Sequence, residues 1–277
     1  MQIEHCTAQC GSVVHGLQLA QASPDDVKTL RELLFQRGVL FFRDQVLSEE
    51  AHLGFAKRFG EIVVNKFFGV VPGYPEIAEV RKEPDQTMNI GGGWHTDHSY
   101  DPDPALGSIL VARELPETGG DTLFTNAQAS CAALPAELKE QLLGLRAIHS
   151  NEHIYGEDGY YAATDLAPLL RGSEGIGCAV HPVLIQHPQT GAEILYVNPG
   201  HTVGIEGMEP EAAFALLHTL YEHAQQPEFQ CRFSWKSGSV AIWDNRLTWH
   251  LAENDYHGER RLMHRITIAG TALAAAA

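Results

Sequence analysis

The most informative segment of this chain is Gly91-Gly92-Gly93-Trp94-His95-Thr96-Asp97-His98. Successive side chains of a strand point to opposite faces, so on a strand His95 and Asp97 would share a face. The three glycines resemble a phosphate loop, but no Lys-Ser or Lys-Thr pair follows, so we interpret them as a flexible approach to this strand. One imidazole and one carboxylate do not complete a metal site, so a third ligand must come from elsewhere in the chain.

The best candidate for that ligand is His250, which ends the segment Trp243-Asp244-Asn245-Arg246-Leu247-Thr248-Trp249-His250. Two imidazoles and one carboxylate are typical of non-haem Fe(II) oxygenases, which leave the opposite coordination face open for a cosubstrate and O₂. Arg261 and Arg265 follow, and on a strand they would lie on one face. A guanidinium group binds a carboxylate in a bidentate manner, so these residues predict a site for an acidic cosubstrate.

The composition favours a globular protein inside the cell. The chain has 277 residues, 44% of them hydrophobic, which is enough for a packed core. Its formal charge of −16 works against binding nucleic acid or anionic membrane surfaces. The cysteines are few and scattered, and neither a signal peptide nor a long apolar run occurs. We therefore expect one cytoplasmic domain over residues 1–277, and self-association into a homo-oligomer stays open.

The pattern of elements predicts a mainly β fold with flanking helices. A helix opens at Ser23 and ends at Gly38, a buried strand follows at 39–42, and a second helix covers 48–59. Further helices should follow Pro135 and Pro210. Short strands are expected at 107–113, 121–125, 182–186, 193–197, 229–235, 239–243 and 262–269. This order favours an antiparallel double-sheet barrel or jelly roll.

Two segments fit no regular element. Residues 149–180 have weak periodicity and several glycines, so we expect a loop that covers the site. Residues from about 271 to 277 are rich in alanine, and we expect them to be a frayed tail.

The order of the motifs resembles the taurine dioxygenase and chlorophenoxyacetate dioxygenase family of Fe(II)- and 2-oxoglutarate-dependent oxygenases. The shared pattern is His-x-Asp, a distant His, and an Arg ten to thirteen residues after that His. Supporting segments occur in the same order along nearly the whole chain: Gly119-Gly120-Asp121-Thr122, His181-Pro182-Val183, Val197-Asn198 and Arg260-Arg261-Leu262-Met263-His264-Arg265.

The resemblance implies a double-stranded β-helix, which is a cupin-like jelly-roll barrel. It implies an enzyme that uses Fe(II), 2-oxoglutarate and O₂ and that releases succinate and CO₂ as it hydroxylates a substrate. By the same matching, the iron ligands are His95, Asp97 and His250.

The resemblance also assigns the residues around the cosubstrate. Arg261 matches the residue that pairs with the far carboxylate of 2-oxoglutarate, and the Thr122 hydroxyl helps to bind it. Trp243 would pack beside the cosubstrate. Arg265 matches the position at which relatives bind the sulfonate or carboxylate of their substrate.

The substrate cavity departs from that of the taurine-specific relatives. Asn65 and Phe68 stand where those relatives carry a His and a Tyr, and Gly91 stands where they carry an Asn. Tyr155 and Tyr196 match aromatic positions that line the family's cavity. These changes argue against taurine and favour another small organic anion, such as a sulfonate, a sulfate ester or a carboxylate.

Other functions stay open on the sequence alone. The same cofactors drive desaturation or cyclisation in natural-product biosynthesis, whereas halogenation is disfavoured because Asp97 occupies the place of the halide. A metal-binding barrel without redox chemistry is a second alternative. A zinc hydrolase also needs three protein ligands and an open position, but it requires a general base for which this sequence has no distinctive candidate.

Overall fold

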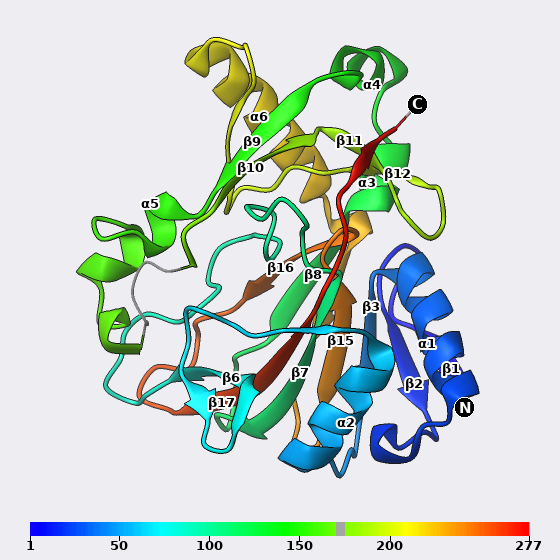
Figure 1. Ribbon diagram of the computed structural model, residues 1–277, viewed down its shortest axis with the longest axis vertical. Helices are drawn as coiled ribbons and strands as arrows, with labels where there is room; N and C mark the ends of the chain where they lie inside the picture. The colour runs from blue at the N-terminus through cyan, green and yellow to red at the C-terminus, as the bar shows by residue number, and fades with distance from the viewer. Residues whose placement is uncertain (170–174, 277) are drawn as a thin grey trace.

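The computed structural model describes residues 1–169 and 175–276. Two helices near the N-terminus cover one face of its main sheet (Figure 1). Helix α1 spans Pro24–Arg37 and begins with the predicted capping box, in which Ser23 and Asp26 bond each other's backbone N–H. Helix α2 spans Glu49–Phe59 and is capped by Ser48. Leu30, Leu34 and Phe55 are fully buried, because they pack against the sheet in one continuous core.

The main sheet combines strands from both ends of the chain. Its strands follow the order β1 (Gln2–His5), β2 (Ser12–His15), β3 (Val39–Phe42), β15 (Val240–Asp244), β7 (Gly107–Glu114), β17 (Arg261–Ile268), β6 (Tyr74–Lys82) and β5 (Val70–Val71), with β4 (Ile62–Val63) also paired to β17. Strand β2 runs parallel to β3, and the pairs from β3 to β6 are antiparallel.

A smaller antiparallel sheet faces the main one. It consists of β14 (Gln230–Phe233), β8 (Thr122–Asn126) and β16 (Thr248–Ala252). One hydrophobic cluster joins the two sheets, since Phe41, Leu110 and Trp243 of the main sheet contact Phe124 and Phe233 of the smaller one. Two sheets closed over a shared core form a jelly-roll barrel, which confirms the predicted fold class.

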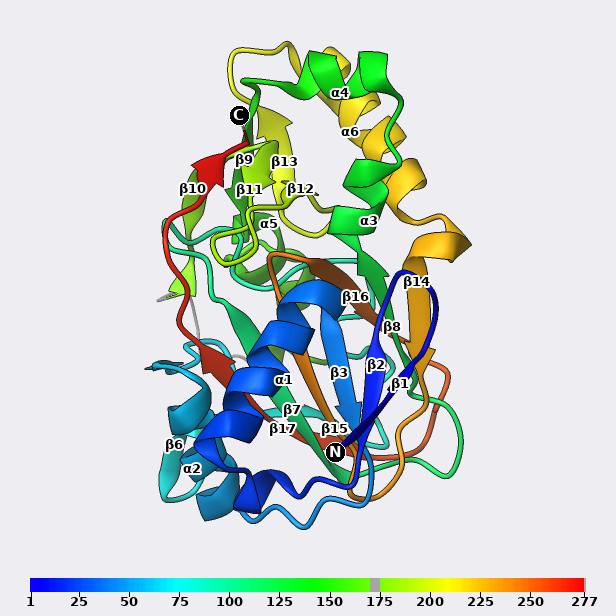
Figure 2. The same cartoon turned by 90° about the vertical axis from the view of Figure 1, so that its right-hand side faces the viewer.

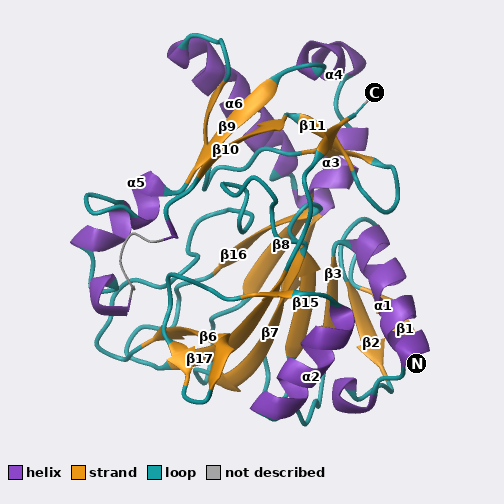
Figure 3. Cartoon of the chain, viewed as in Figure 1, coloured by secondary structure: helices purple, strands orange, loops and turns teal. Residues whose placement is uncertain are grey.

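The remaining elements lie beyond one end of this barrel (Figure 2). They include a sheet of β10 (Cys178–Pro182), β9 (Arg146–Ser150) and β13 (Thr202–Ile205), and a sheet of β12 (Glu193–Leu195), β11 (Leu184–Gln186) and β18 (Ala274–Ala275). Helices α3 (Ala127–Ala132), α4 (Ala136–Leu142) and α6 (Pro210–Ala224) lie beside them (Figure 3). Short 3-10 turns occupy Leu19–Gln21 and Pro227–Phe229.

Two segments differ from their expected form. The predicted loop at 149–180 contains helix α5 (Glu152–Tyr155) and 3-10 turns at Tyr160–Ala163 and Ala167–Leu169, while residues 170–174 lie outside the described residues. The predicted tail is not wholly frayed, because Ala274–Ala275 pairs with β11 and so satisfies backbone groups at the edge of that strand. Residue 277 also lies outside the described part of the chain.

Candidate active site

Backbone pairing brings the His-x-Asp segment to the distant histidine. His95 and His250 form an isolated antiparallel bridge, with His95 N–H donating to the His250 carbonyl at 3.1 Å and the reverse bond at 2.8 Å. The expected strand is therefore limited to this bridge, and the chain turns after it because His98 adopts a left-handed φ of 61°.

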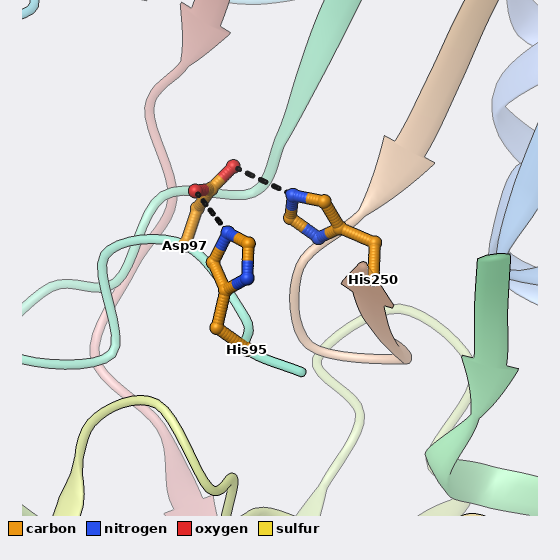
Figure 4. A group of neighbouring side chains, drawn as sticks. All are labelled: His95, Asp97 and His250. Atoms are coloured by element: carbon orange, nitrogen blue, oxygen red, sulfur yellow. Dashed lines mark ion pairs between the residues drawn. The ribbon is translucent and has the colours of Figure 1, made fainter. Parts of the chain in front are cut away.

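The three predicted ligands converge. One ligand atom from each of His95, Asp97 and His250 lies within 4.8 Å of the others. Figure 4 shows both imidazole rings directed at the two carboxylate oxygens, with Nε2 of His95 3.7 Å from Oδ1 and Nε2 of His250 3.9 Å from Oδ2. Two imidazoles and a carboxylate at this spacing suit a divalent transition metal such as Fe(II).

Asp97 also contacts a buried cation. Nη1 of Arg265 lies 3.3 Å from each carboxylate oxygen, and the Ser108 hydroxyl donates to Oδ2 at 3.4 Å. Burial by itself raises the pKa of Asp97, but Arg265, His250 and His95 outweigh it and hold that pKa well below its ordinary value. Asp97 is therefore ionised, which is the form that binds a metal.

The ligand histidine on β16 is kept neutral. Burial, and then the neighbouring His95, hold the pKa of His250 well below its ordinary value. A neutral imidazole has a free lone pair for a metal, so the electrostatics of the three side chains agree with their geometry.

A small cavity next to these ligands contains unpaired hydrogen-bond donors. Its lining includes Thr122, Trp243, Arg261 and Arg265 together with His95 and His250. Nε and Nη2 of Arg261 and Nε1 of Trp243 are buried and have no hydrogen-bond partner among the described residues. Unsatisfied buried donors are costly, so a cavity with several of them fits an anionic, oxygen-rich ligand such as 2-oxoglutarate.

Trp235 supports two residues of this cavity and was not predicted from the sequence as a site residue. Its indole Nε1 donates to the Thr122 hydroxyl at 2.9 Å, and the Arg261 guanidinium lies 5.7 Å from the centre of its ring. The alternating pattern at 229–235 places Trp235 on the inner face with Phe233, which is the only sequence signal that could have indicated it.

A larger cavity adjoins the first and is lined by some of the residues that were predicted to bind the substrate. Gly91 lines both cavities, and Tyr155 lines the larger one, where its ring stacks on Phe67 at 4.5 Å. Phe68 does not line either of these cavities, but its ring lies 6.3 Å from that of Tyr155 and supports the wall from behind.

Besides Phe68, two further predicted substrate residues lie outside both cavities. Asn65 uses its side-chain oxygen to accept the backbone N–H groups of Phe67 and Phe68, each at 2.9 Å, so it shapes its own turn. Tyr196 is buried in a separate cluster with Ile185, and its ring packs against histidines of β9 and β10. The structure thus assigns both residues to packing instead of to a cavity wall.

Comparisons with known proteins agree with this geometry. The family described as "Taurine catabolism dioxygenase TauD, TfdA family" matches residues 2–267. An alkylsulfatase from Acinetobacter baylyi is 33% identical over 98% of this chain and 85% of its own length. An alpha-ketoglutarate-dependent sulfate ester dioxygenase from Pseudomonas putida is 33% identical over 98% of this chain and 90% of its own length. The crystal structure of a taurine dioxygenase from Burkholderia xenovorans superposes with a TM-score of 0.82 at 34% identity, covering 98% of this chain and 92% of that one. The chain belongs to the TauD/TfdA family of dioxygenases.

Proposed function

We propose that this chain is a dioxygenase that uses Fe(II), 2-oxoglutarate and O₂ to hydroxylate a small organic anion, namely a sulfonate, a sulfate ester or a carboxylate. Succinate and CO₂ are the coproducts. The observation that carries the proposal is the convergence of His95, Asp97 and His250 beside the buried guanidinium of Arg261, whose Nε and Nη2 have no hydrogen-bond partner among the described residues. Membership of the family and the names of the sulfate ester relatives support the same reaction class.

Three side chains would hold the metal, and they are His95, Asp97 and His250. When bound, the iron together with 2-oxoglutarate and O₂ supplies the oxidising power that breaks the substrate C–H bond. The chain contributes a fixed geometry, because the two backbone hydrogen bonds between His95 and His250 fix the backbone positions from which both imidazole rings extend.

The remaining side chains bind and orient the two organic reactants. We assign Arg261, Thr122 and Trp243 to 2-oxoglutarate, since their buried donors share a cavity with the ligands. We assign Arg265 to the anionic head group of the substrate, because it is the other arginine of that cavity. Their burial excludes water, which strengthens each charged contact.

Replacing Asp97 with Ala tests the proposal. The variant should lose substrate-dependent succinate release, whereas Asp103→Ala, an exposed Asp on the same loop, should keep it. Under anaerobic conditions the unmodified protein should develop a weak visible charge-transfer band with Fe(II) and 2-oxoglutarate, and Asp97→Ala should not. Unchanged turnover in Asp97→Ala would show that this carboxylate is not a ligand.

We also propose that residues 1–277 act as one domain in the cytoplasm, on a small molecule and not on nucleic acid or a membrane surface. The cysteines are unpaired, and the net charge of −16 opposes binding to polyanions. Among the described residues, no helix has the length and apolar character needed to cross a membrane. Cell fractionation and a nucleic-acid binding assay would check the two parts of this proposal.

A further inference from the structure

The larger cavity, which we call the chamber, has a volume of ≈ 640 Å³. Its lining comes from residues 88–95, 153–161, 199–201 and 254. It shares His95 and Gly91 with the small cavity that contains Arg261 and Arg265. The two cavities therefore meet beside a predicted metal ligand, so a substrate whose head reaches Arg265 would place its body in the chamber.

The walls of the chamber are largely aromatic and apolar. Trp94, Tyr155, Tyr160 and Tyr161 contribute rings, and Ile154 adds an aliphatic side chain. Such a surface favours a hydrocarbon ligand, because binding removes apolar surface of the rings and of the ligand from water without breaking any hydrogen bond.

The aromatic wall is tied to the metal-ligand segment. The Tyr161 hydroxyl accepts the backbone N–H of Gly91 at 3.1 Å, and Thr87 donates its hydroxyl to the Asp165 carboxylate at 2.6 Å. These bonds join the segment that carries the wall to residues 87–91, so the chamber has a defined shape next to His95.

No Asp, Glu, Lys or Arg lines the chamber among the residues that the structure describes. Its two asparagine side chains already have partners, whereas Nδ1 of His201 is buried without a partner among the described residues. Asn254 accepts from Lys82 at 2.8 Å and donates to the Thr87 carbonyl at 2.9 Å, while Asn89 donates to the Ala252 carbonyl at 2.9 Å. An ammonium group placed against these walls would lose part of its hydration without gaining a carboxylate, which is unfavourable.

We infer that the substrate is an anion with an uncharged, apolar body, such as an alkyl or aryl sulfonate or sulfate ester, and that the chamber rejects anions that carry an ammonium group. This inference rests on the proposed function, since Arg265 must bind the anionic head. It adds a criterion that the head group alone does not supply, because taurine and a simple alkanesulfonate present the same sulfonate to Arg265.

Taurine and propane-1-sulfonate form a matched pair for the test, since a methyl group in one replaces the ammonium group of the other. Binding of each would be measured by anaerobic calorimetry on protein loaded with Mn(II) and N-oxalylglycine, a non-reactive analogue of 2-oxoglutarate. We expect propane-1-sulfonate to bind at least about tenfold more tightly. Affinity should then rise about threefold per added methylene up to octane-1-sulfonate.

The two possible failures give different results. Equal or tighter binding of taurine would overturn the inference while leaving the proposed function intact. If the Fe(II)-loaded enzyme released no succinate above background with any of these anions, their sulfate esters or the matching carboxylates, the proposed function would fall, and the inference with it.

Gly93 allows the chamber itself to be tested. A Cβ atom at Gly93 would meet nothing within 4 Å, and its φ lies outside the left-handed region, so the backbone accepts a side chain there. A Cβ at Gly91 would instead lie 3.2 Å from the His95 ring, and one at Gly92 would lie 2.5 Å from Asn89. Gly93 is therefore the position of the three at which the chamber can be narrowed without disturbing the ligand.

Gly93→Leu should weaken binding of octane-1-sulfonate by about tenfold or more and change binding of propane-1-sulfonate by less than about threefold. Gly54→Leu is the matched control, because Gly54 lies on α2 with nothing within 4 Å of an added Cβ. That control should leave both affinities unchanged. Retained binding of propane-1-sulfonate by Gly93→Leu would prove that the variant is folded, and unchanged binding of octane-1-sulfonate in that variant would overturn the placement of the body in the chamber.

Discussion

Arg265 and a metal ion should compete for the carboxylate of Asp97. Arg265 is 8% exposed and Asp97 is 7% exposed, so both are buried, and Nη1 of Arg265 lies 3.3 Å from each oxygen of the Asp97 carboxylate. A cation at this distance offsets part of the negative charge by which the carboxylate attracts a metal ion. Arg265→Gln should therefore bind a divalent metal more tightly than the unmodified protein when no substrate is present.

The size of the effect follows from the geometry. Two unit charges about 4 Å apart at an effective dielectric constant of about 20 interact by about 4 kcal/mol. The carboxylate keeps its charge when a metal binds, so only part of this energy appears as a difference in metal affinity between the unmodified protein and Arg265→Gln. A gain of about 1–2 kcal/mol, or about 5- to 30-fold in the metal dissociation constant, is expected.

Titration with Mn(II), followed by electron paramagnetic resonance, measures this constant directly. Arg260→Gln is the matched control, because Arg260 lies next to β17 but pairs with Glu83 and not with Asp97. Propane-1-sulfonate should tighten Mn(II) binding in the unmodified protein by neutralising Arg265, and it should have no such effect in Arg265→Gln. Equal or weaker Mn(II) binding by Arg265→Gln would refute the competition.

Further predictions concern the cosubstrate and the stability of the fold. Arg261→Gln should raise the KM for 2-oxoglutarate about 30- to 100-fold, measured by succinate release, because a buried charged contact is lost. Asp244→Asn should lower the free energy of unfolding by about 3–5 kcal/mol in urea titrations, since it leaves a buried arginine without its counter-ion. Burial lowers the pKa of His52 to about 3, so the folded chain keeps this ring neutral while the unfolded chain protonates it near pH 6.5. Its share of the stability is complete above about pH 6.5 and is lost as the pH falls toward 3, so His52→Leu should flatten this part of the pH dependence measured by urea unfolding. Gly38→Val should lower the melting temperature, with a loss of about 1–3 kcal/mol, because φ is 77° and an added Cβ would lie 2.6 Å from a methyl group of β16.

The sequence predicts those parts of the fold that depend on local chemistry. The start of α1 follows from Ser23 and Asp26, which cap each other, and its end follows from Gly38, whose φ favours glycine. Strands β7 and β17 were predicted nearly to the residue, because apolar runs of that length between turns have few other solutions. The two ligand segments were predicted for a different reason, since their residue types and spacing indicate the chemistry.

Other features depend on contacts between segments that are distant in sequence. Strand β6 was missed because charged residues such as Glu79 and Arg81 interrupt its apolar pattern, although it pairs through its backbone with β17. The contact of Arg265 with Asp97 could not be predicted, because spacing places an arginine on a face and does not say which carboxylate it meets. Tyr196 lies in a core cluster, a position that the sequence could not distinguish from a cavity wall, because an aromatic residue at a family position fits either.

The site divides its tasks between two kinds of structure. The residues proposed for the chemistry lie on β8, β15, β16 and β17 or are bonded to them, so the sheets fix their positions. Apart from Trp94, the aromatic wall of the chamber comes instead from short helical turns at 152–163, which join the rest through a few side-chain bonds such as that of Tyr161 to Gly91. Substitutions in the wall should therefore change which anion binds while leaving metal affinity unaltered, because the backbone pairing of His95 with His250 does not involve those turns. Tyr160, which is 56% exposed at the edge of the chamber, is the position where this separation should be clearest. Tyr160→Ala should alter the affinity for octane-1-sulfonate and leave the Mn(II) dissociation constant unchanged. A parallel change in both constants would show that the wall and the metal site are energetically coupled.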